Sequence, residues 1–184
     1  MIRAAARFLQ DSADSSDVAR VGKEMAHNSD EYVREQMALL LGKIGGAGDT
    51  RLITAQKLVE KDEHPRHAML LASARLRDPE AQQEFLLQLF VDDPHLRAER
   101  VMDIVYISDR SLVPKVAPLL DDTRPGKNVG PSHGPYFIRV CDVTVDALDK
   151  LLGHPFRFVG IAGRRYEPIE IEQVKAAIGV GPRR

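Results

Sequence analysis

Apolar residues recur along the chain at helical spacing, in short segments that are separated by turn residues. The clearest segment follows Asp30 and places five apolar side chains on one helical face: Val33, Met37, Leu40, Leu41 and Ile44. The Asp30 carboxylate can accept from the free amides of a first helical turn, and Gly45, Gly46 and Gly48 favour the end of that helix. The pattern therefore predicts a helix from Asp30 to these glycines.

The same pattern continues as pairs of helices. Asp49 or Thr50 can begin a second helix, whose apolar face would carry Leu52, Ile53, Ala55 and Val59. Further pairs begin at Pro65 and Pro94, because proline suits the first helical turn. Pro118 is expected to kink or shorten the second helix of the latter pair, since proline has no amide hydrogen to donate. These segments predict an all-α fold.

Two polar markers repeat with one period. An apolar residue followed by arginine recurs, with the arginines 31, 32, 31 and 42 positions apart: Arg3, Arg34, Arg66, Arg97 and Arg139. Aspartates recur in phase, 32, 29 and 31 positions apart: Asp17, Asp49, Asp78 and Asp109. Two markers with one period predict a repeat protein, in which stacked copies of one unit bury a shared core.

The period divides the chain into an α-solenoid of about five stacked two-helix copies that form a single domain. The first copy is short and would act as a cap, and the last copy contains insertions. The bounds are 1–28 for the cap, 29–62, 63–91 and 92–122 for the middle copies, 123–135 for a loop, and 136–180 for the last copy.

The segment from Asp30 to Ile44, DEYVREQMALLLGKI, resembles the opening of a HEAT repeat of the short kind found in phycobilisome-lyase-like proteins. The residues that match the family pattern are Asp30, Val33, Arg34, Ala38, Leu41, Gly42 and Ile44. The later copies keep the arginine, at Arg66 and Arg97, without the Leu-Gly pair that follows in the pattern. The resemblance implies an α-solenoid with a binding role. It carries over no catalytic residue, and we expect no metal and no cofactor.

The in-phase arginines allow two interpretations. They could form a basic stripe for phosphates or for an acidic partner. They could instead link neighbouring copies, because an arginine near a helix start can reach the carboxylates or helix-end carbonyls of the adjacent copy. We favour the second interpretation, since repeat markers persist where each copy solves the same packing problem. The in-phase aspartates are expected to cap their helices.

Two stretches break the period. The first, DDTRPGKNVGPSHGP at 121–135, holds three prolines and three glycines, so we expect it to be non-helical and too polar for the core. The second, GHPFRFVGIAGRRY at 153–166, is partly apolar and is expected to pack as an extended segment. Insertions in repeat proteins often fall on the binding face. The candidate partner-binding residues are Arg124, Lys127, Asn128, His133, Arg157, Arg164 and Arg165. The alternative is an ordinary insertion without a function.

Composition narrows the class of partner. The chain has a net charge of −1 and no tryptophan, which disfavours nucleic acid as a partner. The single cysteine, Cys141, fits a reducing compartment, and the sequence shows no signal peptide and no long apolar run. We therefore expect a cytoplasmic protein that does not contact membranes and that is a monomer or a weak oligomer.

The expected function is that of a non-enzymatic HEAT-repeat adaptor or scaffold, which binds a protein partner by its concave face and its inserted loops. The second helices would line that face and expose residues of mixed charge: Arg20, Lys23, Glu24, Arg51, Lys57, Glu60, Gln82, Gln83 and Lys115. Mixed charge favours a protein partner. Three alternatives stay open: a bacterial immunity protein that neutralises a toxin, a lyase-like or nucleic-acid-acting enzyme, and a structural module of a larger assembly.

Overall fold

The computed structural model describes residues 12–128, 137–158 and 163–180. These residues form nine α-helices, several short 3-10 helices and one pair of strands, so the chain is predominantly helical, as the sequence predicted. The chain divides into two compact units, Met1–Leu86 and Leu87–Arg184, and the boundary between them falls within helix α6. Each unit is described by itself.

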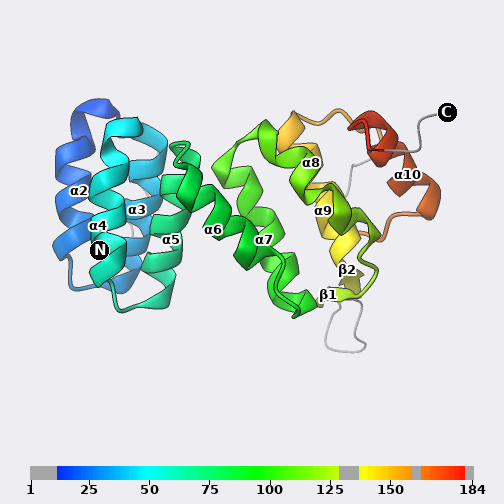
Figure 1. The fold of residues 1–184 in the computed structure, drawn as a ribbon, viewed down its shortest axis with the longest axis horizontal. Helices are drawn as coiled ribbons and strands as arrows, with labels where there is room; N and C mark the ends of the chain where they lie inside the picture. The colour runs from blue at the N-terminus through cyan, green and yellow to red at the C-terminus, as the bar shows by residue number, and fades with distance from the viewer. Residues whose placement is uncertain (1–11, 129–136, 159–162, 181–184) are drawn as a thin grey trace. The chain divides into compact units, whose positions relative to one another are not determined.

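The first unit consists of helices joined by short turns (Figure 1). The elements are η1 (Ser15–Asp17), α2 (Val18–His27), α3 (Glu31–Ile44), η2 (Ala47–Asp49), α4 (Thr50–Val59), α5 (Glu63–Arg75) and the greater part of α6 (Pro79–Leu89). Helix α3 begins and ends where its sequence predicts. The Asp30 carboxylate accepts from the Tyr32 amide at 2.9 Å, and the Gly45 amide donates to the Leu41 carbonyl at 2.8 Å.

Helix α3 packs against both α2 and α5, and α4 packs against α5. Helices α2 and α4 also touch and run parallel: Gly22 lies against the Leu52 side chain, and the Gln56 amide nitrogen donates to the Ala26 carbonyl at 3.3 Å. Both contacts join residues 30 positions apart. The core of the unit is formed mainly by Val21, Met25, Val33, Met37, Ala38, Leu40, Leu41, Ile53, Ala68, Met69 and Ala72.

Arg34 connects the two turns at one end of this core. Its guanidinium donates to the Asn28 carbonyl at 2.9 Å, in the turn before α3. It also donates to the carboxylates of Glu60 and Asp62, in the turn after α4. The Arg34 hydrogen bond holds the pKa of Glu60 below its ordinary value. Glu60 was expected on an exposed binding face. That expectation is wrong, because its side chain is buried in this ion pair.

The second unit combines helices with a short hairpin. After the last turn of α6, its elements are α7 (Pro94–Ile107), η3 (Arg110–Leu112), α8 (Val113–Val116), η4 (Ala117–Asp121), β1 (Pro125–Asn128), β2 (Phe137–Arg139), α9 (Val140–Leu152) and α10 (Pro168–Ala177). Helix α8 is only four residues long, and the chain continues as the 3-10 helix η4 at Pro118. This shortening is what the missing proline amide predicts.

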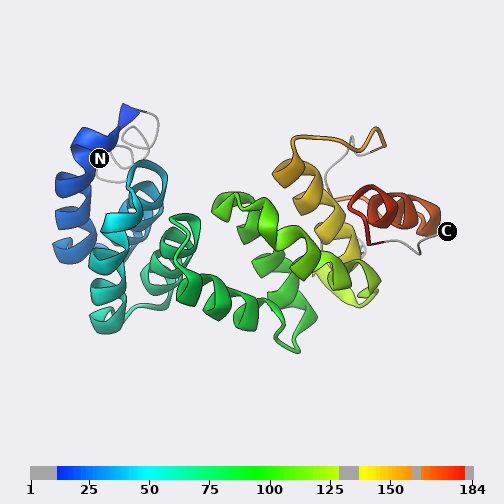
Figure 2. The same cartoon turned by 45° about the horizontal axis from the view of Figure 1, so that its top comes forward.

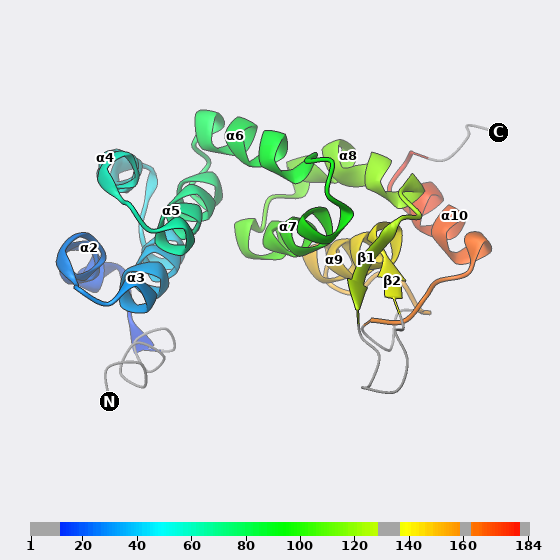
Figure 3. The ribbon, with the colours of Figure 1, turned by 90° about the horizontal axis from the view of Figure 1, so that it is seen from below.

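The hairpin was not expected. Strand β1 pairs antiparallel with β2, with Asn128 opposite Phe137 and an irregularity at Gly126 (Figure 3). The stretch 121–135 was predicted to be too polar for the core, but Gly126 is buried, and a Cβ atom there would lie 2.7 Å from the Ala98 Cβ. The last copy, bounded at 136–180, was expected to consist of two helices, but Phe137–Arg139 form β2 and α9 begins only at Val140. Backbone pairing and the missing glycine side chain account for both differences.

Helix α9 (yellow in Figure 2) lies beside α7 (green) and also packs against η4 and the hairpin. Its residues from Val140 to Asp149 are all buried, so the helix is enclosed on every side. The sequence of this helix shows one apolar stripe: Val140, Cys141, Thr144, Leu148 and Leu151. Burial of the opposite face, with its carboxylates, was not predicted, because it depends on partners from later in the chain.

Arg97 repeats the arrangement of Arg34. It is the fourth residue of α7, as Arg34 is the fourth residue of α3. Its guanidinium donates to the Val91 carbonyl at 3.0 Å, in the turn before α7, and pairs with Asp122, just after η4. Both arginines therefore tie the turn before one helix to the turn after the next.

The other arginine markers differ. Arg66 is also the fourth residue of its helix, but it is exposed, and it donates to the Lys61 carbonyl at 3.4 Å. Arg139 precedes α9, where it pairs with Asp142 of that helix and donates to the Tyr166 carbonyl at 2.6 Å. Its wider spacing in the sequence places it out of register with the others. Arg3 lies outside the described residues.

The aspartate markers take two roles. Asp78 accepts from the first-turn amides of α6, and Asp109 accepts from an amide of η3, as caps do. Asp17 and Asp49 were expected to cap α2 and α4. Instead, each has helical backbone angles, and its carboxylate accepts from the amide three residues earlier, at 3.3 Å and 2.8 Å.

Candidate functional site

The two stretches that break the sequence period both fold against α9 in the second unit. The first contributes β1, which contacts α7 and α9. The second is held by carboxylates of α9. Asp142 accepts from the Tyr166 amide at 3.0 Å, and Asp146 accepts from the Tyr166 hydroxyl at 2.6 Å and from the Gly163 amide at 3.0 Å. The described end of this stretch is therefore fixed to the helix.

A third carboxylate of α9 holds the beginning of the same stretch. Asp149 is buried, and it binds the His154 Nδ1 at 2.7 Å and the Phe156 amide at 3.3 Å. With Asp142 and Asp146 it forms a series at helical spacing, so all three carboxylates serve one side of α9. The described part of 153–166 packs against α9, as expected, but it does so as turns and irregular backbone and not as an extended segment, with positive φ angles at Gly153, His154 and Gly163.

The hydroxyl of Tyr166 donates its hydrogen bond to the Asp146 carboxylate. Burial, and then the hydrogen bond to Asp146, raise the pKa of Tyr166 well above its ordinary value. The tyrosine therefore stays protonated at neutral pH, and Asp146 keeps a hydrogen bond that lets its carboxylate remain buried. Asp146 is thus a positioned anion at the edge of the space described next.

A cavity of about 470 Å³ opens where the two stretches meet, between α7, the hairpin and α9. Its apolar residues are Ala98 and Met102 from α7, Ile138 from β2 and Val143 from α9. Its polar residues are Glu99, Lys127, Asp146 and Lys150, and Gly163 completes the lining. A partly apolar hollow with a few charged groups is the usual form of a binding site.

Three of the charges around the cavity have no partner inside the described parts of the chain. Glu99, Lys127 and Lys150 are exposed, and none of their side chains forms a hydrogen bond or an ion pair with another described residue. Many other charges of this unit, by contrast, are paired internally. The cavity therefore offers charges of both signs, beside an apolar surface, to a bound molecule.

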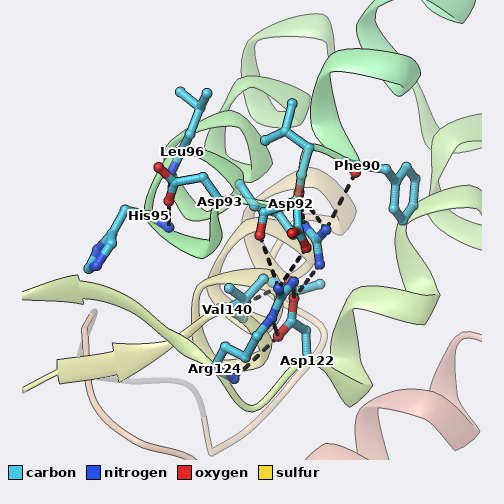
Figure 4. Close-up of polar contacts among 11 residues, drawn as sticks. Phe90, Asp92, Asp93, His95, Leu96, Asp122, Arg124 and Val140 are labelled. Atoms are coloured by element: carbon cyan, nitrogen blue, oxygen red, sulfur yellow. Dashed lines mark hydrogen bonds and ion pairs between the residues drawn. The ribbon is translucent and has the colours of Figure 1, made fainter.

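Among the predicted partner-binding residues, Arg124 has a structural role. Its guanidinium forms two hydrogen bonds of 2.9 Å to the Asp122 carboxylate and donates to the Asp92 carbonyl at 3.0 Å (Figure 4). The hydrogen bond from Arg124, with that from Arg97, lowers the pKa of Asp122 to about 2. Arg124 is thus engaged with its own chain.

Arg164 is also engaged with its own chain. It pairs with Glu170 at 2.6 Å, donates to the Phe158 carbonyl at 2.9 Å and stacks over the Tyr166 ring, with 4.4 Å between its Cζ and the ring centroid. Arg165 is exposed, and it donates to the Phe137 carbonyl of β2 at 2.8 Å. Both arginines help to fix the end of the second stretch.

Lys127, Asn128 and Arg157 are exposed, and of the predicted candidates only Lys127 lines the cavity. His133 lies outside the described residues. The sequence did not single out Glu99, Asp146 and Lys150. Helical spacing could have grouped Asp146 with Lys150, which are four residues apart on α9, but not with Glu99, which lies on α7.

The described residues contain no group of three or more histidine, cysteine, aspartate or glutamate side chains that could hold a metal ion. Burial raises the pKa of the Cys141 thiol to about 11, so this cysteine is protonated and unreactive at neutral pH. None of the described helices combines the length and the apolar character that are needed to cross a bilayer.

Comparison with known proteins gives no relative. No family model, no curated protein and no solved structure matches this chain.

Proposed function

We propose that this protein is a non-enzymatic adaptor of the HEAT-repeat kind, an α-solenoid that binds a segment of a protein partner at the cavity between α7, the hairpin and α9. The observation that carries the proposal is that three charged side chains, Glu99, Lys127 and Lys150, have no partner among the described residues and lie beside an apolar lining. A hollow with an apolar lining and a few available polar groups is the form that binding sites take.

The signs of these charges support a protein segment as the partner. A phosphate backbone requires positive charge along its whole path. This cavity places Glu99 and Asp146 among its two lysines. A peptide that presents an apolar side chain between groups of opposite charge matches both the lining and the rim.

The solenoid part of the proposal rests on two repeated relationships. In the first unit, α2 and α4 run parallel through contacts that are 30 positions apart. Arg34 and Arg97 make the same pair of links, each within its own unit. Copies of one helix pair produce such equivalent contacts.

Affinity capture from native extract tests the proposed function. The bait is the full chain, and the test variant is Lys127→Glu with Lys150→Glu. We expect the wild type to retain a specific protein and the double variant to bind it at least tenfold more weakly. Lys43→Glu with Lys61→Glu is the matched control, because both lysines are exposed in the first unit and neither side chain has a partner among the described residues. Equal capture by the double variant, or no specific protein on the wild type, contradicts the proposal.

A further inference from the structure

Helix α4 of the first unit exposes an apolar face. Ile53 is the only fully buried residue of this helix. Leu52, Leu58 and Val59 are 44%, 78% and 66% exposed. The α4 face is defined here as Arg51, Leu52, Ala55, Leu58 and Val59, all of which are exposed. Adjacent exposed apolar side chains on one helix mark an interaction surface more often than scattered ones do.

The spacing on this face suits another helix. Leu52, Ala55 and Leu58 follow one another at intervals of three residues, and Val59 follows Ala55 at four. Side chains at intervals of three and four residues form ridges on a helix surface, and these ridges fit into the grooves of a second helix. Ala55 lies in the middle and is small, so a partner helix can approach closely between the larger side chains.

Helix α4 contains no carboxylate, and the carboxylates in its flanking turns are hydrogen-bonded or paired within the chain. Asp49 accepts from the Gly46 amide at 2.8 Å. Glu60 and Asp62, in the turn after the helix, both pair with Arg34. They are therefore not available to balance positive charge on the α4 face.

The positive charges beside the face, by contrast, are uncommitted. Arg51 belongs to the face itself. Lys23 follows Gly22, which lies against the Leu52 side chain. Within the described ranges, neither cation forms a hydrogen bond or an ion pair through its side chain. The α4 face therefore combines an apolar stripe with unbalanced positive charge.

We infer that the α4 face binds an amphipathic helix of a protein partner, one that carries acidic residues beside its apolar stripe. The apolar side chains of that helix would cover Leu52, Leu58 and Val59, and its carboxylates would pair with Arg51 and Lys23. This surface belongs to the first unit, and the inference does not depend on the cavity of the second unit.

Two synthetic peptides test the inference on the full chain. Both are 15-residue helices with leucine at the same core positions, and they carry either glutamate or lysine at the flanking positions. Fluorescence anisotropy at low salt is expected to show at least tenfold tighter binding of the glutamate peptide. Added salt should reduce the difference, because exposed charges are screened. Equal affinity for the two peptides at low salt would overturn the inference.

Variants locate the binding. Leu58→Asp is expected to abolish binding of the glutamate peptide, and Arg51→Glu with Lys23→Glu should reverse the preference in favour of the lysine peptide. Leu87→Asp is the matched control, because Leu87 is 72% exposed but lies in the other unit. Unchanged binding by Leu58→Asp would refute the assignment to α4. The Lys127→Glu/Lys150→Glu variant should still bind the glutamate peptide, which would show that the peptide binds at the α4 face and not at the cavity.

Sedimentation of the chain alone tests a competing occupant. We expect the mass of a monomer at the concentrations of the peptide experiment. A dimer that Leu58→Asp dissociates would assign the α4 face to a second copy of the chain and overturn the inference.

Discussion

The guanidinium of Arg97 and the carboxylate of Asp122 form an ion pair across 25 positions of the chain, and their side chains are 13% and 9% exposed. Arg34 and Glu60 stand in the same relationship, 26 positions apart. In each case one arginine satisfies a carboxylate and the carbonyls of the preceding turn. The arginine marker therefore serves the internal structure of each unit.

Arg97→Ala is expected to lower the free energy of unfolding by about 1–3 kcal/mol, because the partly buried Asp122 keeps only Arg124 as its partner and the Val91 carbonyl loses its donor. Urea denaturation followed by circular dichroism measures the change. Arg66→Ala is the control and should cost less than about 0.5 kcal/mol, since Arg66 is exposed. Equal costs for the two variants would contradict the assigned role of Arg97.

Asp122 makes the second unit sensitive to acid. Its pKa is lowered to about 2, by Arg124 first and then by Arg97. A carboxyl group with a lowered pKa stabilises the fold above its ordinary pKa of 3.8, and this contribution is lost as pH falls toward 2. Asp122→Asn should remove on the order of 1–2 kcal/mol of this pH dependence, allowing for the partly exposed Arg124. Urea midpoints between pH 5 and 2 that decline equally in both proteins would refute this.

Gly126 is required by the close packing of β1 on α7. A Cβ atom at this position would lie 2.7 Å from the Ala98 Cβ and 3.2 Å from the Val140 amide nitrogen. Gly126→Ala should therefore destabilise the protein by about 1–3 kcal/mol, as overpacking does. Thermal denaturation of Gly126→Ala, Ala98→Gly and the double variant checks the cause. The double variant should be more stable than the sum of the two single effects predicts, and simple additivity would argue against the clash.

Tyr166 should be the last tyrosine to ionise. Its pKa is raised by burial and by the hydrogen bond to Asp146, so this group stabilises the fold below its ordinary pKa of 10.0 and loses that effect at higher pH. Absorbance at 295 nm during alkaline titration should show one delayed ionisation, and Tyr166→Phe should abolish it. If Tyr166→Phe instead removes an ionisation near the ordinary tyrosine pKa, the hydroxyl of Tyr166 is not buried.

Local signals made much of the first unit predictable. Helix α3 has its cap at Asp30 and its end at Gly45, both within a few residues of the helix itself. The effect of Pro118 was equally local, because proline removes a donor wherever the chain folds. Such features depend on neighbours in the sequence and need no knowledge of the tertiary fold.

The second unit was less predictable, because its key contacts join distant residues. Asp142, Asp146 and Asp149 would read as the solvent face of α9. Their burial depends on donors from Tyr166 and from other residues of the following stretch. Strand β1 has the sequence PGKN, which carries no alternation of apolar and polar residues. It is a strand because its backbone pairs with that of β2.

The candidate site, too, was predictable from the sequence only where local signals were sufficient. The sequence marked both period-breaking stretches as places for a partner, and Lys127 of the first stretch does line the cavity. Arg124 and Arg164 were indistinguishable from it in sequence, but their carboxylate partners are brought to them by the fold. Whether a surface cation is free or paired could not be derived without the tertiary structure.

Hydrogen–deuterium exchange with the captured partner tests the central claim most directly. Binding at the cavity should slow exchange of the backbone amides in α7 near Met102, in the hairpin strands and in α9 near Lys150, and the Lys127→Glu/Lys150→Glu variant should lose this protection. If a saturating concentration of the partner leaves the exchange rates of these three segments unchanged, the cavity is not the binding site.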